Sequence, residues 1–304
     1  MSDVDAASTT ICTKKMSDVD AVNTMNDTTI CTKKMSDVDA ANTMDDKIEA
    51  HLLKVTERKE KLLAMQHEMK LSHLFVTQQN IIYEKIVSKN IITQGFQASH
   101  SARNKINELH TSTTSSGASN ANTRNNSLQY GEIHFDTIAV ALLKLKNMYG
   151  GWKGEGVFYD LGSGVGNVVI AAALVHRWQA VIGIEILEPL YEISGGLIEK
   201  YHLEQQLSDS LMTTNVTTMQ GDLLTLHKWW LDADVVFCNT LAFDDVLLDA
   251  LVILLQKLKT NTFILTTGRL NDKERLADTK FECLEFSIGS FSWGDSTMWI
   301  YKKK

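Results

Sequence analysis

Short apolar runs recur through the second half of the chain, each followed by a segment with helical patterning. Val157–Leu161 predicts a buried strand, the stretch 168–176 predicts a helix, and three glycines at alternate positions join them. The same pattern predicts strands at 180–185, 216–222, 234–239 and 262–267, and an antiparallel hairpin of 282–288 with 297–302. Strands that alternate with helices favour a parallel sheet with right-handed crossovers. We therefore expect an α/β protein with a Rossmann-like, mostly parallel sheet.

The N-terminal part of the chain lacks this pattern. Met1-Ser-Asp-Val-Asp-Ala recurs at Met16 and at Met35, so that residues 1–46 form an imperfect tandem repeat. Its units are too short and too polar to bury a face, which predicts a disordered tail. Residues 111–127 are rich in Ser, Thr and Asn and predict a flexible loop.

A helical region is expected at residues 47–110, where Leu, Met, Lys, Glu and Gln are frequent. Apolar residues with seven-residue spacing fall near one face of such a helix: Ile48, Leu52, Val55, Leu62 and Met69. Lys59 and Gln66 interrupt this face, so packing against the following domain, residues 128–304, is favoured over a free coiled coil.

Composition and charge exclude several classes of protein. The four cysteines form no C-x-x-C pair, so we expect a reducing compartment and no metal site. No apolar run is long enough to span a membrane and no signal-peptide pattern opens the chain, so an intracellular, soluble protein is expected. The net charge is -7, and the only net basic block is residues 51–110.

The glycine turn predicts a ligand site. Gly162, Gly164 and Gly166 would expose main chain at the start of a helix, where unpaired N–H groups face a ligand. Asp160 stands two residues before the first glycine and would repel a pyrophosphate. It suits a cation such as S-adenosylmethionine, which carries an amino group and a sulfonium. A plain tight turn is the alternative for a lone glycine-rich segment.

Polar residues at four predicted strand ends support the prediction of a ligand site. Asp160, Glu185, Asp222 and Asn239 all fall at or beside the carboxyl ends of strands, where open α/β sheets bind ligands. Each alone is ordinary turn chemistry, but the four together favour recognition of an adenosyl group.

Two other features suggest chemistry less strongly. Asp244-Asp245 precedes a long apolar stretch and fits a helix cap and first turn better than a catalytic carboxylate pair. Cys238 lies in a predicted buried strand without a positioned histidine, so a catalytic thiol is not favoured.

Three motifs carry a resemblance to a known family. They are Tyr130-Gly-Glu132, Asp160-Leu-Gly-Ser-Gly-Val-Gly-Asn167 and Asn239-Thr-Leu-Ala-Phe243, with Ser-Phe-Ser-Trp293 as a weaker fourth. In these the chain resembles the Dot-one, or disruptor of telomeric silencing, family of non-SET histone H3 lysine methyltransferases. The resemblance implies a class I methyltransferase fold with a seven-stranded sheet and an antiparallel closing strand.

The resemblance also implies roles for individual residues. It places Tyr130, Gly131 and Glu132 on a loop over the cofactor. The methionine end of the cofactor would be held by Asp160, Gly162 and Asn167, in the turn that also includes Gly164 and Gly166. The resemblance places Glu185 at the ribose, and Asp222 with Leu223 around the adenine, where the family usually carries Phe. Asn239 stands at the methyl-transfer point, and Phe243 and Trp293 are expected to wall the lysine channel. Thr240 and Leu241 depart from the family's usual Asn and Phe.

The implied activity is transfer of a methyl group from S-adenosylmethionine to a lysine in the globular core of nucleosomal histone H3, in the nucleus. Because residues 111–304 are net acidic, contact with DNA would fall to basic groups of the helical region and of the end of the chain: Lys54, Arg58, Lys59, Lys61 and Lys70, with Lys302, Lys303 and Lys304. Two alternatives stay open, because fold and cofactor site do not fix the acceptor. One is a methyltransferase of a non-histone protein, and the other is an inactive scaffold that binds S-adenosylmethionine.

Overall fold

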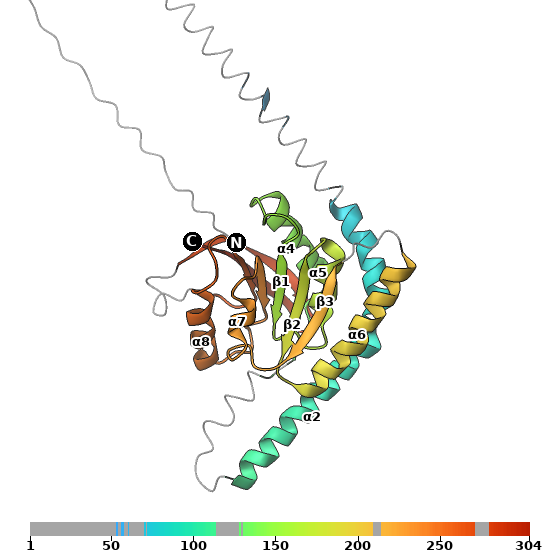
Figure 1. Ribbon diagram of the computed structural model, residues 1–304, viewed down its shortest axis with the longest axis vertical. Coiled ribbons are helices and arrows are strands. Elements are labelled where there is room, and N and C mark those ends of the chain that lie inside the picture. Colours follow the sequence, from blue (N-terminus) through green and yellow to red (C-terminus); the bar gives the residue numbers. More distant parts are fainter. Residues whose placement is uncertain are drawn as a thin grey trace, which may run out of the picture. The chain divides into compact units, whose positions relative to one another are not determined.

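The computed structural model describes residues 53, 56, 57, 60, 70, 72–113, 128, 130–208, 214–270 and 280–304, without the side chains of 107 and 109–113 (Figure 1). The chain divides into two units, 1–64 and 65–304, and the account below concerns the second. The repeat tail, the seven-residue face of 48–69 and most of the Ser-, Thr- and Asn-rich segment lie outside the described residues.

A seven-stranded sheet forms the centre of the second unit, with the strand order β3-β2-β1-β4-β5-β7-β6. The bounds are β1 Val157–Leu161, β2 Ala180–Glu185, β3 Asn215–Gln220, β4 Val235–Cys238, β5 Phe263–Thr266, β6 Phe281–Phe291 and β7 Gly294–Lys303. Strands β1 to β5 pair in parallel, whereas β7 is antiparallel to both β5 and β6. The Rossmann-like, mostly parallel sheet with one antiparallel strand is therefore confirmed.

The observed strands refine the expected ones. β1 and β2 have the expected bounds, and β4 and β5 are each one residue shorter at both ends. β6 and β7 form a longer hairpin than predicted, and β7 lies inside the sheet, between β5 and β6. The hairpin sequence alone could not decide which of its two strands would pair with β5.

Six helices with stated bounds accompany the sheet, namely α2 Lys89–Thr113, α4 Phe135–Asn147, α5 Asn167–Val175, α6 Glu188–Leu207, α7 His227–Trp230 and α8 Asp245–Leu255. Alternate strand residues face opposite ways, so Phe158 joins the core beneath α4, α5 and α6 while Tyr159 joins the core beneath α7 and α8. Every residue of α5 is buried, because this helix packs between the sheet and α4.

The helical region also contributes to the core. A helix over residues 72–86 precedes α2, and Val76, Tyr83 and Ile86 are buried in the core cluster of α4 and α5. α2 packs along α6 (Figure 1) and continues to Thr113, three residues past the expected end of the region. The described part of this region thus packs against the sheet domain. None of the described helices is both long and apolar enough to cross a membrane.

The start of α8 provides a test of the cap assignment. Asp244 is the N-cap residue, and its side chain accepts a hydrogen bond from the backbone N–H of Leu247 at 2.8 Å, so the expected cap is confirmed.

We expect Asp244→Ala to lower the free energy of unfolding by about 1 kcal/mol in urea denaturation, because an N–H at the helix start loses its partner. Asp244→Asn should change it little, since Asn also caps helices; equal losses for both variants would contradict this role.

Candidate active site

The glycine turn between β1 and α5 forms the floor of the site. Gly162, Gly164 and Gly166 have φ angles of 85, 56 and 87°, the left-handed region that favours glycine. The turn is fixed to β2, because the N–H groups of Gly162 and Ser163 donate to the carbonyl oxygen of Ile184 at 2.8 and 3.0 Å. The predicted strand, glycine turn and helix are therefore present.

Tyr130 lies directly against this turn. A Cβ atom on Gly164 would stand 2.4 Å from the Cε2 atom of Tyr130, and one on Gly95 would stand 2.9 Å from its Cε1 atom. The aromatic ring is therefore held between α2 and the glycine turn, with Phe96 in edge contact at a centroid distance of 5.0 Å. A pocket opens beside it, lined by Tyr130, Gly131, Ile133, Asp160, Gly162, Ser163, Gly164, Asn167, Val168, Phe237 and Asn239.

Three buried carboxyl groups dominate the electrostatics. Glu132, Asp160 and Glu185 are 3%, 1% and 5% exposed. Burial raises the pKa of Asp160, as does the nearby charge of Glu185; burial and the charge of Asp160 likewise raise the pKa of Glu132. Within the described part of the chain, no Lys or Arg forms an ion pair with any of the three.

Several of these oxygens also lack a hydrogen-bond partner. Both carboxyl oxygens of Glu132 and the Oδ1 atom of Asp160 are buried and unpaired. An unsatisfied buried acceptor costs about 1–3 kcal/mol, and more when it is charged. The cluster is therefore arranged for a ligand that brings positive charge and N–H donors, and it disfavours a phosphate.

Glu185 has a different immediate role from the one expected. Its Oε2 atom accepts a hydrogen bond from the N–H of Gly164, and its Oε1 atom accepts one from the N–H of Leu187, both at 2.8 Å. These bonds favour the ionised form, but burial dominates and the pKa of Glu185 is raised. Glu185 thus holds the glycine turn through its hydrogen bond with Gly164, and its contact with a ribose stays a prediction.

Asn239 follows β4 and lines the same pocket as the turn. Its Oδ1 atom accepts a hydrogen bond from the hydroxyl of Thr267 at 2.7 Å. Asn167, the first residue of α5, donates from Nδ2 to the carbonyl oxygen of Ile133 at 3.4 Å and so ties the Tyr130 segment to the turn.

Other predicted site residues lie outside the pocket lining. Asp222 accepts a hydrogen bond from the N–H of Leu224 at 2.8 Å, which is turn chemistry, and Leu223 is buried in the core beneath α7 and α8. Phe243 packs against the same core. Trp293 lies on Gly131, where a Cβ atom would stand 2.3 Å from its Cζ3 atom, and it is 41% exposed. The roles of these four residues stay predictions.

Sequence reasoning missed several residues of the site: Ile133, Ser163, Val168 and Phe237 in the pocket lining, and Thr267, which bonds to Asn239. Ser163 lies within the glycine string and lines the pocket with a buried, unpaired hydroxyl. Thr267 follows β5 and is 2% exposed. The glycine motif could have indicated Ser163, whereas only the pairing of β4 with β5 reveals Thr267.

Metal and thiol chemistry find no support in the described residues. No group of three or more His, Cys, Asp or Glu side chains suited to a metal ion occurs among them. Cys238 is fully buried and donates to the carbonyl oxygen of Leu161 at 3.1 Å, and burial raises the pKa of its thiol.

The strand order and the site define the class of the protein. A 3-2-1-4-5-7-6 sheet with a glycine turn after its first strand and acidic groups around that turn is a class I methyltransferase fold with a site for S-adenosylmethionine.

Comparison with known proteins gives the family. The model of the family "Histone methylation protein DOT1" matches residues 113–285, more than half of the chain, and the chain belongs to that family. Its cofactor is S-adenosylmethionine, which the buried carboxyl groups and bare glycine backbone fit. The protein is an S-adenosylmethionine-dependent methyltransferase. A comparison with proteins of curated function found no match.

Solved structures of other methyltransferases share the fold at low identity. A tRNA methyltransferase of B. subtilis is 15% identical with a TM-score of 0.41, covering 57% of this chain and 66% of its own. Magnesium protoporphyrin IX methyltransferase of Synechocystis PCC 6803 is 15% identical with a TM-score of 0.43, covering 74% of this chain and 97% of its own. A precorrin methyltransferase of Geobacter metallireducens GS-15 is 17% identical with a TM-score of 0.42, covering 56% and 88%.

The glycine turn can be tested with a matched pair of variants. Gly164 and Gly154 both have positive φ angles, but only at Gly164 would a Cβ atom meet a neighbour, the ring of Tyr130. We expect Gly164→Ala to weaken S-adenosylmethionine binding at least about tenfold in calorimetry, because the added methyl group displaces Tyr130 from the bare backbone. Gly154→Ala carries the same backbone strain in open space and should bind normally; equal losses in both variants would rule out a specific role for the turn.

The buried carboxyl groups predict a pH dependence of cofactor binding. Because the pKa values of Glu132 and Asp160 are raised in the unliganded fold, these groups hold protons until the pH exceeds those raised values. A bound cation favours their ionised forms, so binding should release protons and strengthen as the pH rises from the ordinary carboxyl range, about 4, toward the raised pKa values. Calorimetry in buffers of different ionisation enthalpy measures this release.

Two variants control that experiment. Glu132→Gln removes one titrating group and should reduce the proton release. Glu155→Gln alters an exposed carboxylate that pairs with Arg177 at 2.9 Å, and it should leave the release unchanged. Binding without proton release in the wild type would mean that the carboxyl groups are already ionised and would contradict the prediction.

Proposed function

We propose that this methyltransferase acts on a lysine in the globular core of histone H3 within the nucleosome, as a chromatin regulator of the nucleus. Membership of a family described by histone methylation supports the substrate. The observation that carries the chemistry is the cluster of buried, unpaired carboxyl oxygens on Glu132 and Asp160, of which Asp160 lines the same pocket as Asn239. A cationic methyl donor held by that cluster would have its reactive end close to an uncharged, hydrogen-bonding side chain.

The cofactor supplies an electrophilic methyl group on a sulfonium, and the protein's own groups bind the cofactor and orient the acceptor amine. The carboxyl groups bind the cationic end, while the glycine backbone at Gly162 and Gly164, which lines the pocket without side-chain bulk, lets it approach closely. In-line transfer needs a neutral lysine amine about 3 Å from the methyl carbon. Free lysine has a pKa of about 10.4, and an apolar channel lowers it by excluding water.

Three side chains are assigned to the acceptor. Asn239 orients the amine through its amide. Trp293, which lies over the pocket residue Gly131, and Phe243, which packs against the core beneath α7 and α8, would supply the apolar and aromatic surface. The pocket lining contains no histidine, lysine or ionised base positioned for the amine, so we assign deprotonation to solvent.

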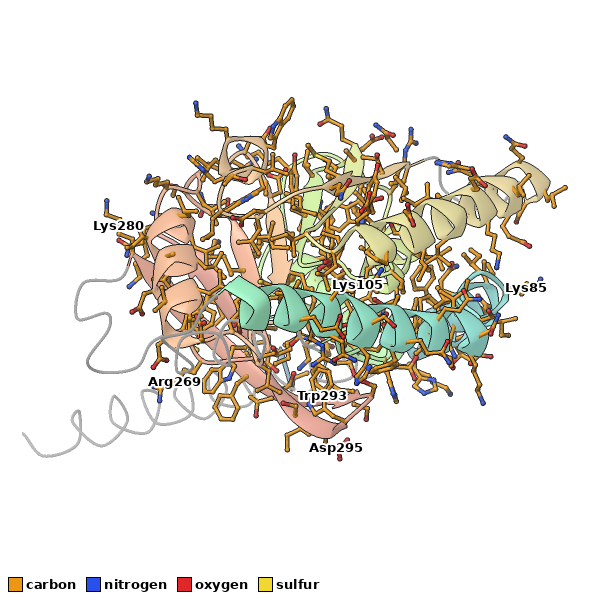
Figure 2. The ribbon with its side chains drawn as sticks, turned by 90° about the horizontal axis from the view of Figure 1, so that it is seen from below. Lys85, Lys105, Arg269, Lys280, Trp293 and Asp295 are labelled. Atoms are coloured by element: carbon orange, nitrogen blue, oxygen red, sulfur yellow. The ribbon has the colours of Figure 1, made fainter. Side chains whose placement is uncertain are left out.

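The positively charged groups are arranged unevenly around the site. Lys302, Lys303 and Lys304 end β7, and the pairing of Lys302 with Phe263 puts them at the start of β5. The site lies at the other end of β5, and Lys303 is itself buried. Figure 2 shows the same separation along the hairpin, with Lys280, whose carbonyl oxygen accepts from the N–H of Lys304 at 2.8 Å, far from Trp293.

Contact with nucleosomal DNA therefore falls to the helical region in this proposal. Lys54, Arg58, Lys59 and Lys61 lie outside the described residues, and Lys70 is exposed. Lys85 and Lys105 add exposed positive charge along the described helices (Figure 2). The net charge of -7 speaks for the second candidate, a non-histone protein substrate, and the experiment must separate the two.

The test compares acceptors directly. Methyl transfer from radiolabelled S-adenosylmethionine is measured on nucleosomes, on free histone H3 and on cell extract. We expect nucleosomes to be methylated fastest, with rates that fall steeply as salt rises, because phosphate contacts are salt-dependent. Equal rates on nucleosomes and free histone, or labelling of extract proteins other than histones, would transfer the proposal to a non-histone substrate.

Asn239→Ala is the control for catalysis in the same assay. It should lower kcat at least about tenfold with little change in cofactor affinity, the pattern of a lost transition-state interaction. Turnover equal to that of the wild type would remove Asn239 from the catalytic assignment.

A further inference from the structure

The loops that follow β4 and β5 lie side by side, and hydrogen bonds join them. The strands pair in parallel with Cys238 opposite Thr266, so the next residue of each strand, Asn239 and Thr267, also meet. Thr267 is 2% exposed, and its hydroxyl stands 2.7 Å from the Oδ1 atom of Asn239. The same hydroxyl oxygen accepts a hydrogen bond from the N–H of Leu241 at 3.2 Å.

These contacts fix the direction of the hydroxyl proton. A buried hydroxyl needs an acceptor for its proton, and the N–H of Leu241 already points at the oxygen. The acceptor in reach is the Oδ1 atom of Asn239. The amide of Asn239 must therefore turn its oxygen toward Thr267, which leaves its Nδ2 hydrogens directed elsewhere.

We propose that Thr267 is a positioning residue for methyl transfer, which sets the orientation of the Asn239 amide by donating a hydrogen bond to its Oδ1 atom. This rests on the proposed role of Asn239. One lone pair of the oxygen is bound by Thr267, and the second stays free for an N–H of the acceptor amine. The χ2 torsion of asparagine is broad, so without this bond the amide would sample both orientations in the pocket.

One further hydrogen bond joins the two loops, and another joins the last residue of β5 to the loop that follows it. The N–H of Gly268 donates to the hydroxyl of Thr240 at 2.9 Å, and the hydroxyl of Thr266 donates to the carbonyl oxygen of Gly268 at 2.8 Å. A Cβ atom on Gly268 would stand 2.8 Å from the hydroxyl oxygen of Thr240, so glycine permits the close approach. Thr267 therefore acts within a backbone geometry that its neighbours maintain.

The test replaces the hydroxyl with a methyl group of similar size. Thr267→Val should lower kcat on the substrate that the wild type methylates by about tenfold, with less than about twofold change in the dissociation constant of S-adenosylmethionine. Thr267→Ser keeps the hydroxyl and should restore kcat to within about threefold of the wild type. A normal kcat in Thr267→Val, or a Ser variant as slow as the Val variant, would overturn the proposal.

A matched control separates positioning from stability. Thr262 stands at the other end of the same strand, is 1% exposed, and donates its hydroxyl to the carbonyl oxygen of Ala233 at 2.8 Å. Thr262→Val loses one buried hydrogen bond remote from the pocket and should destabilise the fold without lowering kcat. If both Val variants lowered kcat equally, loss of stability would explain the result and the positioning role would fail.

A double-mutant cycle gives a readout that does not need a substrate. Urea unfolding of Thr267→Val, Asn239→Ala and the double variant should show a non-zero coupling between the two sites, because they share one hydrogen bond. In the kinetic cycle, Thr267→Val should cost little more in the Asn239→Ala background. Additive effects in either cycle would overturn the proposal.

The same experiments distinguish a failure of this proposal from a failure of the proposed function. A wild type inactive on nucleosomes but active on an extract protein would contradict the histone substrate alone, and the kinetic comparison would then use that protein. A zero coupling in unfolding would contradict the Thr267 proposal alone, whatever the acceptor.

Discussion

A cluster of buried carboxyl groups without an ion pair, at the carboxyl edge of the sheet, is the constraint around which the site is built. Glu132, Asp160 and Glu185 come from a loop and two strands, and all three are buried without an ion pair from any described residue. Burial of a carboxylate without a partner is costly. Binding of a cationic cofactor beside these groups offsets the unfavourable free energy of their burial. This explains why the glycine turn has acidic rather than basic neighbours.

The residues of the site follow three neighbouring strands of the sheet. β1 carries Asp160 and the glycine turn, and its neighbour β4 leads to Asn239, which lines the same pocket. On the other side of β4, β5 leads to Thr267, which donates a hydrogen bond to the side chain of Asn239. The parallel register places these residues at one edge of the sheet, so the roles that we propose in binding, transfer and positioning fall to residues that are far apart in the chain.

The β6–β7 hairpin has opposite chemical character at its two ends. Its turn brings Trp293 over Gly131 beside the pocket, and its open end gathers Lys280 and the C-terminal lysines (Figure 2). In the function that we propose, the aromatic end would face the acceptor lysine. The basic end is separated from the site by the length of β5, so any phosphate contact there would be remote from methyl transfer.

The sequence by itself determined the elements and the cofactor. Apolar runs of strand length, alternate glycines with positive φ angles and strand-ending carboxylates are local features, and β1, β2 and the acidic glycine turn match their predictions. The tertiary structure decided what depends on contacts across the chain. It placed β7 between β5 and β6, turned Glu185 and Asp222 to backbone N–H groups, set Phe243 outside the pocket lining and joined Thr267 to Asn239. Sequence spacing carries no information on which carboxylate finds a backbone donor or which strands pair, because those choices are made by packing between distant segments.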